Sequence, residues 1–136
     1  MPSADGRPSV LFVCEHNTGR SEMAEAFLRR FVRDDVEMSS AGTIAADRPD
    51  PSVVAAMAEI RMDVSRARPK LIDAAVLARA DRIITMGYDV EGVPRVDDDW
   101  GLPDPRGQSP ERVREIRDRV CKKAGDLAKE LLRPVP

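Results

Sequence analysis

The stretch that decides the fold is VLFVCEHNTGRSEMAEAF, residues 10–27, which joins an apolar run, a cysteine, a short polar loop and a helix-like segment. Residues 10–14 form an unbroken run of β-branched, aliphatic and aromatic side chains ending in Cys14, which is typical of a strand buried on both faces of a parallel sheet. From Ser21 onward, apolar residues recur at helical spacing between charged ones. They are Met23, Ala24, Phe27, Leu28 and Phe31. The stretch therefore predicts a strand, a tight loop and a helix, with Cys14 where the strand ends.

Strand and helix signals alternate along the rest of the chain. The expected elements are a strand at 36–40, helices at 52–61 and 73–79, a strand at 82–86, and a short strand at 93–96 inside a long loop, 87–109. Ser109 and Pro110 are a typical N-cap and first residue for a last helix, which is expected to run to about Leu132 before Pro134. This alternation predicts an α/β fold, a three-layer doubly wound sheet of about four parallel strands with helices on both faces.

Composition limits the classes of protein that the chain can belong to. Its 136 residues, 42% of them hydrophobic, suit one domain at 9–136 behind a loose polar leader at 1–8. A formal net charge of −2 argues against electrostatic binding of nucleic acid or of an acidic membrane surface. The start of the chain lacks a signal peptide or spanning segment, so we expect a cytoplasmic protein. Two cysteines and one histidine are too few for a disulfide framework or a four-ligand zinc site, so we expect free thiols.

The loop after the first strand is the expected place for chemistry, because ligands of α/β proteins bind at the carboxyl edge of the sheet. Backbone N–H groups of a short loop that leads into a helix N-terminus favour an anion, and the same field stabilises a thiolate at Cys14. Arg20 adds a planar fork for two oxygens of a tetrahedral oxyanion, and Ser21 can donate its hydroxyl to the sulfur. We therefore interpret Cys14 as a nucleophile and not as a buried structural cysteine.

These residues resemble the Cys-x5-Arg-Ser loop of the low-molecular-weight tyrosine phosphatase superfamily, which includes one class of arsenate reductases. SSAGT at 39–43, IITMG at 83–87 and DWGLPDPRGQS at 99–109 fall in the order and approximate spacing of that superfamily. The likeness covers nearly the whole chain. It implies a phosphatase-like fold and a thiolate chemistry on a tetrahedral oxyanion.

The resemblance also implies roles for single residues. Cys14 is the implied nucleophile, Asn17 the support of the loop, and Ser21 the support of the thiolate. The implied oxyanion cradle is Glu15, His16, Asn17, Thr18, Gly19, Arg20 and Ser21. Asp104 is the implied general acid, since a carboxyl group between two prolines lies on a stiffened loop where partial burial favours its protonated form. Taken alone, Asp104 also fits an ordinary turn aspartate.

Phosphatase and arsenate reductase share their first step, the attack of Cys14 on the central atom while Asp104 protonates the departing oxygen. Water then hydrolyses a phosphocysteine, whereas a second thiol attacks a cysteine–arsenate adduct. Tyrosine phosphatases of this family flank the loop with aromatic residues, where this chain has IAADRPD at 44–50 and RGQS at 106–109. Without those rings a phosphotyrosine loses its stacking surface, which favours a small inorganic oxyanion.

The source of the second thiol distinguishes the subclasses of arsenate reductase. Thioredoxin-coupled reductases carry two more cysteines in the lid, where residues 83–100 have none and Tyr88 lies near the expected position. The resemblance is then to arsenate-mycothiol transferases, which implies no tightly bound cofactor and an external thiol, mycothiol or alternatively glutathione. A mycoredoxin- or glutaredoxin-type redoxin would regenerate that thiol, and we expect a monomer. Cys121 is interpreted as a packing residue of the last helix.

Some alternatives stay open at this point. A low-molecular-weight phosphotyrosine phosphatase is one, and a non-catalytic oxyanion-binding domain, in which Glu15 weakens the nucleophile, is another. His16 is either a second base or a spacer whose backbone N–H matters. Trp100 and Tyr88 either line the mouth of the site or pack the loop.

Overall fold

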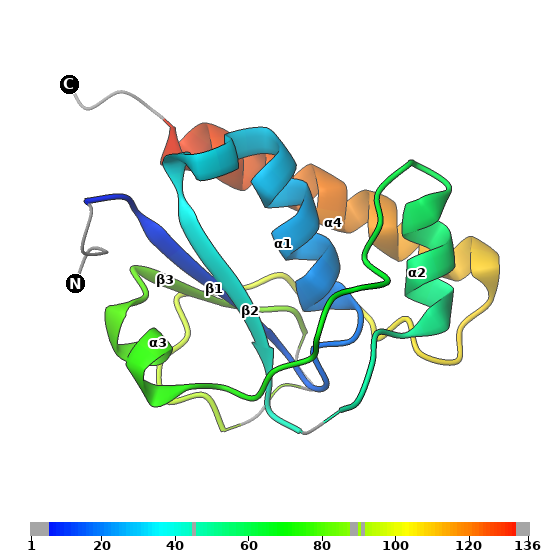
Figure 1. The fold of residues 1–136 in the computed structure, drawn as a ribbon, viewed down its shortest axis with the longest axis horizontal. Coiled ribbons are helices and arrows are strands. Elements are labelled where there is room, and N and C mark those ends of the chain that lie inside the picture. The colour runs from blue at the N-terminus through cyan, green and yellow to red at the C-terminus, as the bar shows by residue number, and fades with distance from the viewer. Residues whose placement is uncertain (1–5, 45, 88–89, 91, 133–136) are drawn as a thin grey trace.

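The computed structural model describes residues 6–44, 46–87, 90 and 92–132, which form a parallel sheet with helices on both of its faces (Figure 1). The strands are β1 (Ser9–Cys14), β2 (Glu37–Gly42), β3 (Arg82–Thr85) and β4 (Asp98–Asp99). They pair in the order β2-β1-β3-β4, and every pair is parallel. Cys14 therefore ends a central strand, beside Gly42 of β2.

The helices are α1 (Arg20–Val32), the 3-10 turn η1 (Arg33–Asp35), α2 (Pro51–Ala58), α3 (Ala74–Arg79) and α4 (Pro110–Leu131). The first, second and fourth α-helices share one face of the sheet, and α3 lies on the other face (Figure 1). Ser109 caps α4 by accepting a hydrogen bond from the backbone N–H of Arg112 at 3.2 Å, and Pro110 is its first residue. The predicted α/β architecture is confirmed.

The fourth strand lies at a different place from the predicted one. The pattern predicts a strand at 93–96, but β4 is Asp98–Asp99, paired with Ile84 and Thr85 of β3. Val96 is 47% exposed. An edge strand pairs its backbone on one side only and can carry polar side chains, so two aspartates give no apolar or alternating signal. The prediction of the strand position was therefore wrong.

Two further predictions needed correction within helices. The predicted helix 52–61 ends at Ala58, because Arg61 adopts a left-handed φ of 61° that stops the helical path. Phe31, expected on the buried face of α1, is 41% exposed and stacks on Phe27 with a ring separation of 6.5 Å. It lies in the last turn of α1.

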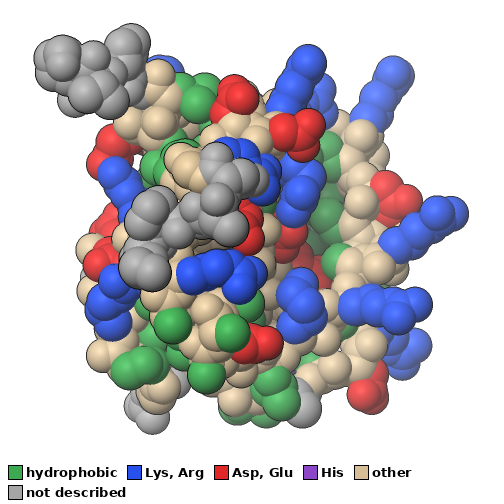
Figure 2. Space-filling model, turned by 60° about the vertical axis from the view of Figure 1, so that its left-hand side comes forward, with side chains coloured by type: hydrophobic (Ala, Val, Ile, Leu, Met, Phe, Trp, Pro, Cys, Tyr) green, Lys and Arg blue, Asp and Glu red, His purple; other side chains and the backbone are tan. Residues whose placement is uncertain are grey.

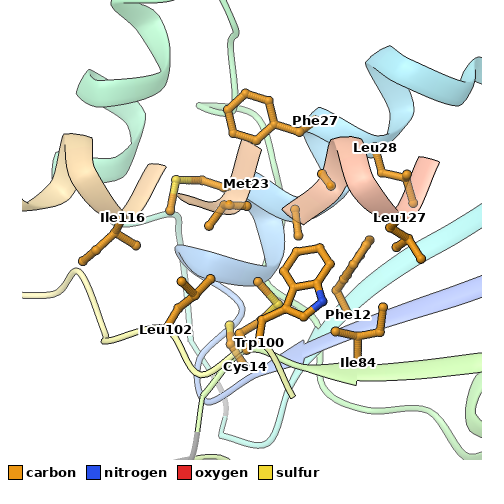
Figure 3. Packing of buried hydrophobic residues seen from close by; sticks show 14 of the residues in the cluster. Phe12, Cys14, Met23, Phe27, Leu28, Ile84, Trp100, Leu102, Ile116 and Leu127 are labelled. Carbon is orange, nitrogen blue, oxygen red and sulfur yellow. The ribbon is translucent and has the colours of Figure 1, made fainter. Parts of the chain in front are cut away.

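The side chains of β1 alternate between two cores, as the unbroken apolar run predicts. Val10, Phe12 and Cys14 belong to the larger core under α1, α2 and α4, and Leu11 and Val13 belong to the smaller core on the other face. Figure 3 shows the larger core, in which the rings of Phe12 and Trp100 lie 5.4 Å apart. Trp100 is 6% exposed, so it packs the loop and does not line the mouth of a site. Tyr88 lies outside the described residues.

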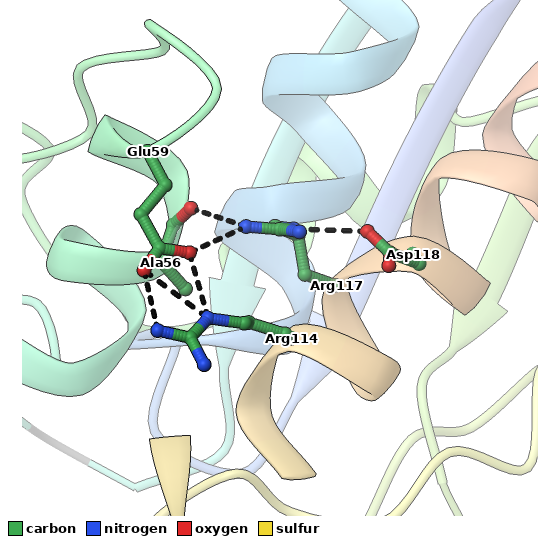
Figure 4. Close-up of polar contacts among 5 residues, drawn as sticks. All are labelled: Ala56, Glu59, Arg114, Arg117 and Asp118. Atoms are coloured by element: carbon green, nitrogen blue, oxygen red, sulfur yellow. Dashed lines mark hydrogen bonds and ion pairs between the residues drawn. The ribbon is translucent and has the colours of Figure 1, made fainter. Parts of the chain in front are cut away.

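Arg117 of α4 ties that helix to α2, as Figure 4 shows. Its Nη1 donates to the carbonyl of Ala56 at 2.8 Å and to Glu59 Oε1 at 3.0 Å, and its Nε donates to Asp118. Arg114 holds the same Glu59 carboxylate, and its hydrogen bonds lower the pKa of that group. This clamp fixes α2, whose N-terminal residues contact the candidate site.

Lys and Arg side chains occur together with Asp and Glu over the face that Figure 2 shows. This mixture agrees with the small net charge of −2 in the sequence. None of the helices in the described part of the chain is long and apolar enough to cross a membrane.

Candidate active site

Cys14 lies at the carboxyl end of β1 with 3% of its surface exposed. Its Sγ lies 2.8 Å from Ser21 Oγ and accepts a hydrogen bond from the backbone N–H of Asn17 at 3.2 Å. Asn17 comes from the short turn that joins β1 to α1, and Ser21 comes from the first turn of α1. The strand thus positions the sulfur, and the turn and the start of α1 position the groups that surround it.

A chain of hydrogen bonds fixes which way the Ser21 hydroxyl points. The backbone N–H of Lys70 can only donate, and it bonds to Asn17 Oδ1 at 2.9 Å. The amide nitrogen of Asn17 therefore faces Ser21, to which it donates at 2.8 Å. Because Ser21 Oγ accepts this bond, its own proton is available to the sulfur of Cys14. Two donors then meet the sulfur, an arrangement that stabilises a thiolate.

Serine 21 should control the reactivity of Cys14. We expect Ser21→Ala to slow the alkylation of Cys14 by iodoacetamide at pH 6 by roughly tenfold, since one hydrogen bond to a charged sulfur is lost. Ser65→Ala, which changes an exposed serine far along the chain, is the matched control and should leave the rate unchanged. Equal rates in the two variants would contradict the hydroxyl's role.

The backbone of the turn rests on the end of β2. A Cβ atom on Gly42 would lie 2.7 Å from the carbonyl carbon of His16 and 2.8 Å from the nitrogen of Asn17, so only glycine fits there. Asn17 itself has a left-handed φ of 56°, which asparagine tolerates better than most residues. Thr43 and Ile44 then donate their N–H groups to the carbonyls of Cys14 and Glu15. The SSAGT segment thus shapes the turn.

The two remaining predicted catalytic groups lie at the same edge of the sheet. Arg20 begins α1, is 3% exposed and donates from Nη1 to the carbonyl of Leu102 at 2.7 Å. A Cβ atom on Gly19 would lie 3.1 Å from Cγ of Pro105, so the Asp-Pro loop packs on the turn. Asp104 is half-buried, and its Oδ1 accepts the backbone N–H of Arg106 at 2.9 Å. The structure therefore brings the Asp-Pro loop against the predicted cradle.

The other cradle residues lie as follows. Glu15 and His16 are half-buried, and the carboxylate of Glu15 lies 3.7 Å from His16 Nε2. The hydrogen-bond partners of the Cys14 sulfur are Ser21 and Asn17. Thr18 is 9% exposed, and its carbonyl accepts the N–H of Asp50 at 2.9 Å. Gly19 is buried and is the N-cap of α1, where it has no side chain to cap the helix. The first N–H groups of α1 thus lack the usual side-chain cap, which suits an anion.

Cys121 lies half-buried on α4 and packs against the larger core. Desolvation by this packing raises the pKa of its thiol. A thiol of that kind is a poor nucleophile. Among the described residues, no group of three His, Cys, Asp or Glu side chains is placed to hold a metal ion.

Glu22 is a residue that the sequence pattern did not single out. It is 5% exposed, neither of its carboxylate oxygens has a hydrogen-bond partner among the described residues, and it faces a cavity of about 510 Å³. Burial raises its pKa to about 8, although the charge of Lys70 opposes the rise. In the sequence it stands between Ser21 and Met23 as an ordinary acidic residue of a helix N-terminus, so no spacing signal could have revealed it.

The buried Glu22 should make stability depend on pH. Its folded pKa of about 8 lies above the ordinary 4.5, so the folded state binds more protons between these values, and stability falls as the pH rises through this window. The quantity to compare is the unfolding free energy of Glu22→Gln minus that of the unchanged protein. We expect this difference to rise by roughly 2 kcal/mol, in favour of the variant, between pH 5 and pH 9. Urea denaturation at both pH values measures it, with the exposed Glu111→Gln as control. A difference in unfolding free energy between the two proteins that is the same at both pH values would contradict the raised pKa of Glu22.

A parallel sheet whose central strand ends in a Cys-x5-Arg-Ser turn, facing an Asp-Pro loop, defines an enzyme class that uses a cysteine against tetrahedral oxyanions. Residues 9–135 match the family described as low molecular weight phosphotyrosine protein phosphatase. The chain belongs to this family of enzymes, and the resemblance read from the sequence is confirmed.

Several relatives of the chain are named as arsenate reductases, and some similar solved structures are named as low molecular weight phosphatases. A putative arsenate reductase of Halobacterium salinarum is 39% identical over 138 residues, covering 94% of this chain and 96% of that protein. The solved structure of an arsenate reductase in the phosphate binding state is 30% identical, with a TM-score of 0.82, and the match covers 91% of this chain and 98% of that one. A thioredoxin-dependent arsenate reductase of Corynebacterium glutamicum is 32% identical, with a TM-score of 0.76, over 94% of this chain and 63% of that one.

Proposed function

We propose that this protein is an arsenate reductase whose Cys14 thiolate forms a cysteine–arsenate adduct that is passed to an external low-molecular-weight thiol. The observation that carries the proposal is the sulfur of Cys14, which meets two aligned donors at the mouth of an anion-binding turn. The other cysteine, Cys121, packs against the core on α4. No cysteine lies at 83–100 of the sequence, so the reducing thiol has to come from another molecule.

The first step makes a bond from sulfur to arsenic. The Cys14 thiolate attacks the arsenic of arsenate, an As–O bond breaks, and Asp104 gives the departing oxygen its proton so that it leaves as water. Arg20 and the N–H groups of the turn stabilise the charge on the remaining oxygens. The hydrogen bonds from Asn17 and Ser21 hold the sulfur as a thiolate before the attack.

The second and third steps regenerate the free Cys14 thiolate and reduce the arsenic. The external thiol bonds to arsenic and releases the Cys14 thiolate, with the proton of the thiol going to an arsenate oxygen. A redoxin thiolate then attacks the sulfur of the thiol–arsenate adduct, and the electrons of the S–As bond stay with arsenic, which changes from the pentavalent to the trivalent state. A mixed disulfide between the thiol and the redoxin results. Mycothiol with a mycoredoxin, or glutathione with a glutaredoxin, supplies these two groups.

A reducing compartment is needed for this cycle, so we place the protein in the cytoplasm. We further propose that residues 9–136 act as one domain and as a monomer, because the cradle is built entirely from one chain. No tightly bound cofactor takes part in the proposed steps, which draw their electrons from the two thiols.

Phosphotyrosine hydrolysis is the second candidate, and the name of the family favours it. The first step is the same, and water would then replace the external thiol. The absence of aromatic residues from the sequence at 44–50 and 106–109 removes the surfaces on which a phosphotyrosine ring would stack. We therefore rank the arsenate reaction above it.

One assay separates the two candidates. Arsenite formation is measured with mycothiol and mycoredoxin, with glutathione and glutaredoxin, and with thioredoxin alone, beside the hydrolysis of an aryl phosphate without thiol. We expect arsenite in at least one of the low-molecular-weight thiol systems and little with thioredoxin alone. Failure with every thiol, together with efficient turnover of phosphotyrosine, would overturn the proposal in favour of the phosphatase. Weak aryl phosphate turnover by itself decides nothing, since the first step is shared.

A further inference from the structure

Two arginines line a pocket that borders the cradle at Thr18, and we call this pocket the mouth. This pocket of about 330 Å³ is lined by Thr18 of the turn, by Arg48 and Asp50 from the segment after β2, and by Arg106 and Gly107 of the Asp-Pro loop. Arg48 and Arg106 are both exposed to solvent.

Direct contacts hold both arginine-bearing segments against the turn. The backbone N–H of Asp50 donates to the carbonyl of Thr18 at 2.9 Å, two residues beyond Arg48. Pro105, next to Arg106, lies so close to Gly19 that a Cβ atom there would be 3.1 Å from its Cγ. Both arginines are therefore carried by segments that contact the same turn, and both line the pocket beside it.

The positive charge of this pocket is only partly balanced. Asp50 is its one acidic lining residue, and Oδ1 of Asp50 is already held by the N–H of Ser52 at 2.9 Å and by the hydroxyl of Ser52 at 2.7 Å. Within the described part of the chain, neither Arg48 nor Arg106 forms an ion pair with a carboxylate. Two guanidinium groups that line one pocket favour a ligand with carboxylate groups, because a guanidinium can bind a carboxylate through two parallel hydrogen bonds.

We propose that Arg48 and Arg106 bind the carboxylates of the external thiol, so that the protein selects an acidic low-molecular-weight thiol over a neutral one. This inference rests on the proposed function and narrows it. A peptide thiol such as glutathione, with two carboxylates, fits this mouth. Mycothiol, whose sugar and inositol groups carry hydroxyls and no charge, makes no use of the arginines. The arginines position the thiol sulfur for its attack on the adduct at Cys14 and take no part in bond making.

The kinetic test compares the charged thiol with its neutralised form. Arsenite formation is measured with glutathione and with glutathione diethyl ester for the unchanged protein and for Arg48→Gln/Arg106→Gln. We expect the double variant to raise the KM for glutathione roughly tenfold, while the KM for the ester, the KM for arsenate and kcat change less than about twofold. Arg119→Gln, an exposed arginine of α4, is the matched control and should change none of them. A KM for glutathione that stays the same in the double variant would overturn the inference.

A second readout does not depend on arsenate reduction. Iodoacetate and iodoacetamide alkylate the same sulfur, but only the former is an anion, so the ratio of their rates at Cys14 reports the charge of the mouth. We expect the double variant to lower this ratio by roughly fivefold, with no change in Arg119→Gln. An unchanged ratio would overturn the inference even if arsenate is reduced. Failure of arsenate reduction with every thiol, beside a lowered ratio, would instead overturn the proposed function and leave the anionic selectivity of the mouth standing.

Discussion

Replacement of Cys14 with serine is expected to abolish arsenate-dependent thiol consumption, with a fall in rate of about 10³-fold or more. The two hydrogen bonds from Asn17 and Ser21 stabilise a negative charge on sulfur, but they cannot ionise a serine hydroxyl at neutral pH. No general base is needed for a thiolate, and serine would require one. Arsenite formation with the thiol system that supports the unchanged protein measures the loss.

Cys121→Ser is the matched control, because it changes the other cysteine of the chain. The thiol of Cys121 is half-buried on α4 and its pKa is raised by desolvation, so we expect activity within about twofold of the unchanged protein. Both variants should bind inorganic phosphate, since the backbone of the turn remains. Arsenite formation that survives in Cys14→Ser and disappears in Cys121→Ser would contradict the assignment of the nucleophile.

Much of the site could be predicted because it is built from residues close together in the sequence. The strand at 10–14, the turn and the start of α1 lie within one stretch, so the pattern of that stretch places Cys14, Arg20 and Ser21 together without long-range information. Local chemistry also predicts Ser109 and Pro110 at the start of α4. What those predictions share is a physical cause that acts within a few residues.

The features that the sequence did not reveal depend on distant contacts. The fit of Gly42 under the turn arises from pairing between β1 and β2, and the direction of the Asn17 amide depends on the backbone of Lys70, 53 residues away. β4 is specified by its pairing with β3 and not by its own side chains. Glu22 becomes unusual only because the fold buries it beside a cavity. Spacing along one chain carries no record of such contacts.

The hydrogen bond from Arg20 to Leu102 links the turn after β1 to the loop that carries Asp104, the proposed general acid. Arg20 therefore has two functions in the proposed mechanism, because the guanidinium proposed to bind the oxyanion also holds a carbonyl two residues before Asp104. A lysine at this position would keep the positive charge but lose the planar guanidinium with its several N–H donors. It could therefore serve only one of these functions at a time. The position of Asp104 relative to the oxyanion would then vary.

Arg20→Lys is accordingly expected to lower kcat/KM for arsenate by about 10²- to 10³-fold, measured as arsenite formation at low arsenate. Iodoacetamide alkylation of Cys14 should change far less, because the bonds from Asn17 and Ser21 to the sulfur do not involve this side chain. Arg29→Lys, on the exposed side of the same helix, controls for the change of residue type. A small effect on arsenate together with a large effect on alkylation would show that Arg20 supports the thiolate and not the oxyanion. The opposite pattern fits an arginine that holds the substrate and the acid loop in one geometry.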